Sequence, residues 1–177
     1  MTDGPRVVIP FVRGMLWDET RAMGEAVNAT FVDLTGDPYA YGKLIQDLWH
    51  EAKSVILVEQ DIQAEPRLLG EMATCPEPWC AGFGWRFSGA VMPGEAKPQH
   101  PIREKETALF LNKFDASLLA RTPNVPSAVR VRWTQVDLAL FGVLAGKPHL
   151  HEPAVVHLRQ EHPAWAATMT EQDYASA

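Results

Sequence analysis

Glu59 and Asp61 are two carboxylates, one residue apart, that directly follow the apolar run Val55 to Val58. Such a run is typical of a strand buried on both faces, as in the parallel sheet of an α/β protein. Side chains two residues apart in an extended chain point to the same side. Carboxylate oxygens suit Mg²⁺ or Mn²⁺, and such an ion suits a phosphate. The pair therefore predicts a site for a metal-bound phosphate ligand.

Three histidines, His149, His151 and His157, fall within one nine-residue segment. In an extended chain their even spacing would put them on one face. Imidazole is the commonest metal ligand, so the carboxylate pair and one of these histidines would form an open Mn²⁺ site. For any one histidine alone, a surface position or a core hydrogen bond is the simpler interpretation, but the cluster as a whole favours a site.

Asp137 interrupts the apolar stripe of a helix predicted over residues 133–144. A charge buried alone is costly, so an acid at this position is expected to be paired or functional. We consider it a candidate general base. The alternative is a salt bridge to one of three nearby cations, Arg130, Arg132 and Lys147.

Cys75 and Cys80 flank a segment that contains two prolines. Their four-residue gap is not the short spacing of a structural zinc site, and an intracellular chain is not expected to hold a disulfide. We therefore expect reduced, partly buried thiols. The prolines indicate a rigid turn, with Trp79 either packed inward or walling a pocket.

The first 62 residues alternate between strand and helix patterns, which predicts a parallel sheet with right-handed crossovers. The ligand crevice of such a sheet lies beyond the carboxyl ends of its strands, where Asp33 could bind the sugar hydroxyls of a nucleotide. The expected elements are strands over 6–12, 29–34 and 54–62 and helices over 17–27 and 41–53.

The second half is less regular. Residues 82–89 and 93–106 lack helical periodicity and are expected to form a long functional loop or a mobile flap. The other expected elements are a strand over 107–112, a short helix over 116–121 capped by Asp115, the helix over 133–144 and an extended segment over 149–157.

The chain has 177 residues and 46% hydrophobic content, enough for one core, so we expect a single domain over 1–177. Within it we expect a β-α-β-α-β nucleotide-binding half (5–62) and an acceptor and metal half (63–165) with a flexible tract (93–106). The net charge of −6 argues against nucleic-acid binding. The N-terminus lacks the order of a signal peptide and no apolar stretch approaches a membrane span, so a cytoplasmic location is expected.

Taken in order, the motifs resemble the nucleotide-sugar glycosyltransferases of the GT-A fold. They are Val-Glu-Gln-Asp-Ile, Cys-Pro-x-Pro-Trp-Cys, Trp-x-x-x-Asp and His-x-His-x-Pro-x-x-x-His. The set is similar to small glycosyltransferase-like proteins of bacteriophages and actinobacteria, over roughly residues 5 to 160. The resemblance implies a Rossmann-like GT-A fold, with a mainly parallel central sheet flanked by helices. If the chain is encoded by a phage, it implies the host cytoplasm.

The resemblance also implies roles for individual residues. Asp61 would contact a Mn²⁺ or Mg²⁺ ion directly, and Glu59, which departs from the more usual Asp, would lie nearer the ribose or a metal-bound water. The late histidine ligand would be His151 or His157. The nucleotide pocket would consist of Pro10, Phe11, Arg13 and Asp33, with Asp137 as the base.

The implied activity is metal-dependent transfer of a sugar from a nucleoside-diphosphate sugar to the hydroxyl of an acceptor glycan or protein that the sequence does not identify. Because the chain is short for this fold, its acceptor site could require a homo-oligomer, a partner protein or ordering of residues 93–106. The alternatives are a metal-dependent phosphoesterase or nucleotidyltransferase with the same residues, and a non-catalytic sugar-nucleotide-binding module. Donor sugar, acceptor and stereochemical course are not encoded in any motif.

Overall fold

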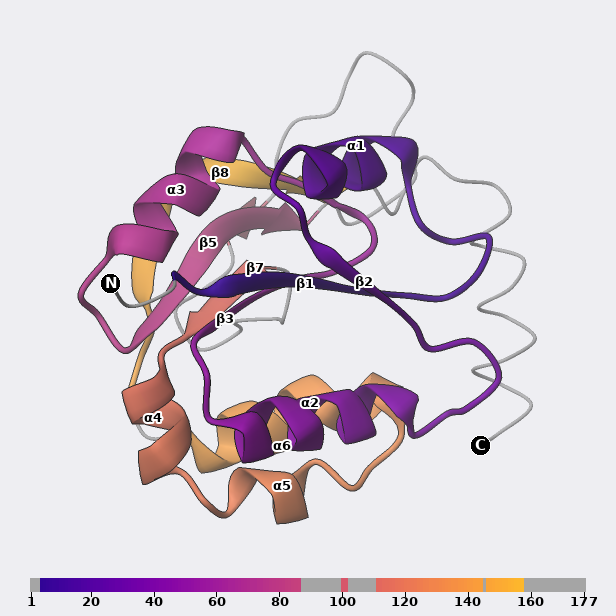
Figure 1. Cartoon of the computed structure of the whole chain (residues 1–177), viewed down its shortest axis with the longest axis vertical. Coiled ribbons are helices and arrows are strands. Elements are labelled where there is room, and N and C mark those ends of the chain that lie inside the picture. The colour runs from indigo at the N-terminus through magenta and orange to yellow at the C-terminus, as the bar shows by residue number, and fades with distance from the viewer. Residues whose placement is uncertain (1–3, 87–99, 102–110, 145, 158–177) are drawn as a thin grey trace.

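The computed structural model describes residues 4–86, 100–101, 111–144 and 146–157. These residues form one mixed sheet with helices on both faces (Figure 1). The strands are β1 (Arg6–Phe11), β2 (Thr30–Asp33), β3 (Val55–Val58), β4 (Ile62–Gln63), β5 (Trp79–Arg86), β6 (His100–Pro101), β7 (Leu111–Phe114) and β8 (His149–His157). The helices are α1 (Asp18–Ala26), α2 (Ala40–Glu51), α3 (Pro66–Thr74), α4 (Ala116–Arg121), α5 (Val125–Ala128) and α6 (Val136–Val143), with a 3₁₀ turn, η1 (Trp133–Gln135).

The strand order is β2-β1-β3-β7-β5-β8-β4, and β6 pairs with β5. β1 is parallel to both β2 and β3, and β5 is parallel to β8. β7 lies between β3 and β5 and is antiparallel to both. Among the described strands, β1, β2, β3, β5 and β8 therefore run in one direction, while β4, β6 and β7 run in the other. This confirms the expected α/β class with a mainly parallel central sheet flanked by helices.

Each face of the sheet is covered by its own helices, α1 and α3 on one side and α2, α5 and α6 on the other (Figure 1). Alternate residues of one strand enter the two cores. In β3, Leu57 packs on the α2 side, whereas Ile56 and Val58 pack on the α3 side. All residues of β3 are buried, as the apolar run predicted.

The helices of the first half form where the apolar spacing predicted them. α2 buries Ile45, Leu48 and Trp49, and the left-handed φ of 51° at Ala52 terminates the helix. The predicted cap of α4 is also confirmed, because the Asp115 carboxylate accepts a hydrogen bond from the Ser117 backbone N–H at 2.8 Å.

The expectation of a loop from residue 82 is wrong for residues 82–86, which belong to the central strand β5. The glycines resemble a loop sequence, yet Gly82 is needed within the sheet. A Cβ atom there would lie 2.7 Å from the Leu111 side chain. The strand expected over 107–112 is observed over Leu111–Phe114, with residues 102–110 outside the described residues.

The 93–106 tract contributes β6 at residues 100–101, and its other residues lie outside the described ones. Helix α3 had no counterpart among the expected elements. Trp79 packs inward, donating to the Asn112 side-chain oxygen at 3.0 Å and stacking on Phe141. Within the described parts of the chain, no helix is long and apolar enough to cross a membrane.

Candidate functional site

The carboxyl ends of β1, β2 and β3 meet at one edge of the sheet. Phe11 pairs with Asp33, the last residues of β1 and β2. The Val12 backbone N–H donates to the Gln60 side-chain oxygen at 2.6 Å, which ties the end of β1 to the acid motif after β3. The structure therefore brings the expected nucleotide residues and Glu59 to the same edge.

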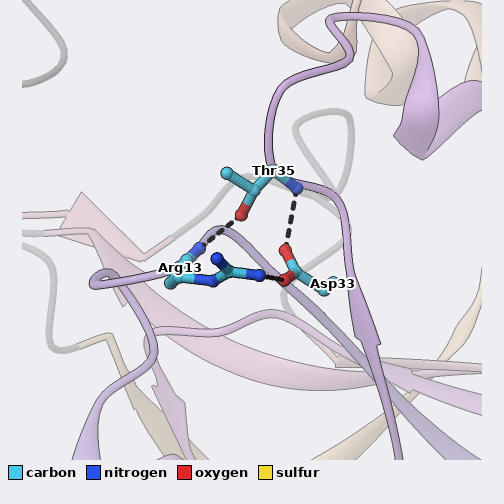
Figure 2. A network of polar contacts seen from close by, with 3 residues as sticks. All are labelled: Arg13, Asp33 and Thr35. Carbon is cyan, nitrogen blue, oxygen red and sulfur yellow. Dashed lines mark hydrogen bonds and ion pairs between the residues drawn. The ribbon is translucent and has the colours of Figure 1, made fainter.

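Arg13, Asp33 and Thr35 form a polar network at this edge (Figure 2). The Arg13 guanidinium contacts Asp33 Oδ2 at 2.9 Å, the Thr35 N–H donates to Asp33 Oδ1 at 2.9 Å, and the Arg13 N–H donates to Thr35 Oγ1 at 2.7 Å. Hydrogen bonds from Thr35, and then from Arg13, lower the pKa of Asp33. Its carboxylate is thus ionised and oriented. Of the other two expected nucleotide residues, Pro10 is buried and Phe11 is half-buried.

The buried hydroxyl of Tyr41 in α2 contacts one carboxylate and feels the negative charge of two more. Tyr41 donates to Glu59 Oε1 at 3.5 Å. Burial raises the pKa of Tyr41 well above its ordinary value, and the negative charges of Glu59, Asp137 and Asp61 raise it further. Asp61 is itself 6% exposed. Asp137 is more than seventy positions from Glu59 and Asp61 in the sequence, yet all three charges act on the Tyr41 phenol.

The backbone around the acid motif is held by α1. The Trp17 N–H donates to the Gln60 carbonyl at 3.2 Å, and Thr20 Oγ1 donates to the Ile62 carbonyl at 2.9 Å. The Ile62 N–H in turn donates to the Glu59 carbonyl at 3.2 Å, which closes a turn over the motif. The buried Asp61 therefore has a fixed backbone.

Asp137 lies in the first turn of α6 and is half-buried. Its helical neighbours Val136 and Leu140 are fully buried, whereas Leu138 is 80% exposed. The aspartate is therefore at the margin of the apolar stripe, and its charge acts on Tyr41.

The two late histidines occupy different places on β8. His157 pairs with Ile62 of β4, so its backbone lies next to the acid motif. His151 pairs with Gly82 of β5, six residues earlier. At roughly 3.3 Å per residue, that separation prevents both histidines from binding one ion. The register places His157, of which the backbone is described, closer to Asp61.

His151 instead lies beside Cys75 and Cys80, and one ligand atom of each residue lies within 4.8 Å of the other two. Among the described residues, these three form the one compact group of His, Cys, Asp or Glu side chains that could hold an ion. Both cysteines are free thiols. Burial raises the pKa of Cys80 to about 12, and burial also lowers the pKa of His151, which favours its neutral form.

The expectation of Mg²⁺ or Mn²⁺ at Glu59 and Asp61 stays a prediction, because these carboxylates are not part of that compact group. Mg²⁺ in proteins commonly keeps several waters and is held by one or two carboxylates together with substrate phosphates. A buried Asp61 and its acidic neighbours fit that pattern, and a cation would offset the concentration of negative charge around Tyr41.

Sequence reasoning missed Tyr41, Gln60 and Thr35. Gln60 could have been suspected because it stands between the two acids, and Thr35 because it follows Asp33 in a sharp turn. No local signal connects Tyr41 to Glu59, since the contact is made only when α2 packs under the sheet.

No protein-family profile matches the sequence, and none of the curated proteins matches it. Among solved structures, the chain is similar to a glycosyltransferase involved in the glycosylation of the major capsid of PBCV-1. The two share 11% identity over 95% of this chain and 100% of that chain, with a TM-score of 0.49.

Proposed function

We propose that this chain is a metal-dependent glycosyltransferase with a GT-A arrangement, which transfers a sugar from a nucleoside-diphosphate sugar to an acceptor hydroxyl. The observation that carries the proposal is the position of the acid motif directly after β3, tied through Gln60 to Val12 at the sheet edge where Arg13 and Asp33 also lie. Ligands of open α/β sheets bind at this edge.

Donor binding is divided between two groups of residues. Arg13 and Asp33 contact the nucleoside, with Asp33 fixed by Thr35 so that its carboxylate faces the ligand in one orientation. Asp61 holds Mn²⁺ or Mg²⁺, Glu59 binds the ribose or a metal-bound water, and His157 is the late ligand. The cation neutralises the diphosphate leaving group.

Asp137 is the general base of the proposal. Its place in the first turn of α6, half-buried near the acid cluster, lets it accept the proton of an acceptor hydroxyl that enters beside the donor. In-line attack by that hydroxyl would invert the anomeric centre.

A screen of nucleotide sugars, with and without Mn²⁺, tests this function by thermal shift and then by mass spectrometry of the products. We expect one UDP- or GDP-sugar to raise the melting temperature only with the metal. Asp137→Asn should keep that shift and lose transfer, because it keeps the shape of the base and removes its proton acceptor. Release of free phosphate from simple esters would indicate a phosphoesterase instead, and metal-independent stabilisation would indicate a binding module.

A further inference from the structure

A second cluster of ligating side chains lies on the α3 side of the sheet, away from the acid motif. Cys75 follows the last residue of α3, Cys80 is the second residue of β5, and His151 is on β8. Their ligand atoms lie within 4.8 Å of one another. Three segments that are distant in sequence thus converge on one point.

The sheet register explains this convergence. Cys80 pairs with His149 and Gly82 pairs with His151, so Cys80 and His151 are on adjacent parallel strands, two positions apart. Residues spaced by two share a face. Cys80 belongs to the α3-side core, and the loop after α3 adds Cys75 from above.

We propose that Cys75, Cys80 and His151 bind a structural Zn²⁺ ion. Two thiolates and an imidazole are ligands that zinc prefers over Mg²⁺ or Mn²⁺. The site is independent of the proposed transferase activity.

The state of His151 supports a ligand at this point. Its Nε2 atom is buried and has no hydrogen-bond partner among the described residues. A buried polar atom without a partner is costly, and coordination of an ion would satisfy it.

Two charged neighbours complete the surroundings. The buried Lys113, which pairs with Cys80 across β5 and β7, donates from Nζ to the Cys75 carbonyl at 2.5 Å. This hydrogen bond fixes the Cys75 backbone. Glu71 acts on His151 electrostatically but is paired with Arg67 and lies outside the group of three ligands, so a water would be the fourth ligand.

Zinc at this site would fasten the loop between α3 and β5 to β8. The far end of β8 pairs with β4, directly after the acid motif. The ion therefore stabilises the strand that brings His157 to Asp61, without itself contacting the donor.

Elemental analysis of the full chain, purified without chelator, tests the proposal directly. We expect one zinc per chain, and cobalt substituted for it should give a thiolate-to-cobalt charge-transfer absorption. Cys75→Ser and His151→Asn should each lose most of the metal and the absorption. The matched control His50→Asn alters a histidine on the exposed side of α2 and should keep both.

Because Cys80 is buried, a Cys80 variant could fail to fold. The test therefore uses the metal content of the wild type, Cys75→Ser and His151→Asn. A wild-type chain without zinc that also fails to bind added zinc or cobalt would overturn the proposal. So would a Cys75–Cys80 disulfide in the freshly purified protein, or loss of the zinc in Asp61→Asn. Failure of the transferase assay alone would leave these metal readings unchanged.

Discussion

Tyr41 links the acid motif to the helix beneath it. Its hydroxyl donates to Glu59, and burial together with three carboxylates keeps the pKa of the phenol high, so that it remains a protonated donor. A donor at this position orients Glu59.

Tyr41→Phe removes that donor from a buried position. We expect the free energy of unfolding to fall by about 1 kcal/mol, because Glu59 loses a buried partner. Urea denaturation measures the change. The matched variant Tyr39→Phe alters an exposed ring, 46% accessible, and should be neutral. Equal effects at the two positions would contradict the role assigned to Tyr41.

The helices and strands that pack against elements near them in the sequence could be predicted from the sequence. β1, α1, β2, α2 and β3 follow one another through the first half, and apolar spacing alone located them. β5 was not recognised, because Gly82 and Gly84 are typical of a loop in the sequence. Their place in a strand depends on long-range partners, namely Leu111 of β7 against Gly82 and the pairing of both glycines with β8.

Asp115 is expected to stabilise α4 through its cap. Asp115→Ala should lower the free energy of unfolding by about 1 kcal/mol at pH 7, since the Ser117 N–H loses its acceptor. Burial opposes ionisation of Asp115, but hydrogen bonds from Ser117 and Ser54 outweigh it, and the pKa is lowered overall.

A lowered folded-state pKa means that this stabilisation is present above the unfolded value of about 3.9 and is lost as the pH falls through the folded value. Denaturation of wild type and Asp115→Ala from pH 7 to pH 3 should therefore show a difference that shrinks below about pH 4. A difference that grows in acid would contradict the cap. The exposed Asp47→Ala serves as the control.

Gly42 lets α2 approach the backbone of α5 closely. A Cβ atom there would collide with the Val129 carbonyl oxygen, which cannot rotate away as a side chain could. We expect Gly42→Ala to cost about 1–3 kcal/mol by overpacking. Gly70→Ala in α3, with nothing within 4 Å, should instead stabilise by about 0.5–1 kcal/mol. Thermal unfolding measures the stability of both variants. A stability change of the same sign in Gly42→Ala and Gly70→Ala would contradict this packing.

Over the whole molecule, the two halves of the chain share one sheet. β7, from the second half, pairs directly with β3 of the first, and the α2-side core includes residues from Val8 to Leu144. The halves are therefore interleaved in the sheet.

This interleaving predicts a single cooperative unfolding transition. The fluorescence of the six tryptophans, which include the core residues Trp49 and Trp79, should follow tertiary packing, while far-UV circular dichroism follows the helices. The two curves should coincide in urea. Two separated transitions would mean that residues 5–62 and 63–165 unfold independently.

The candidate site depends on the same long-range arrangement, which limits what the sequence could predict of it. The apolar run of β3 located the acid motif, but the extended strand expected over 54–62 ends at Val58, and Glu59 to Ile62 form a turn instead. The choice between His151 and His157 required the β4–β8 register, and the approach of His151 to Cys75 required α3 and β5. Neither the β4–β8 register nor the approach of His151 to Cys75 can be predicted from the periodicity of the sequence.

The most direct measurement is calorimetric titration of the effective nucleotide sugar into Asp61→Asn and into Asp47→Asn, each with and without Mn²⁺. Asp47 is an exposed carboxylate on α2, so its variant controls for loss of charge. We predict that Asp47→Asn keeps metal-dependent donor binding and that Asp61→Asn loses it. Unchanged metal-dependent binding in Asp61→Asn would contradict a cation held at the end of β3, and with it the proposed transferase site.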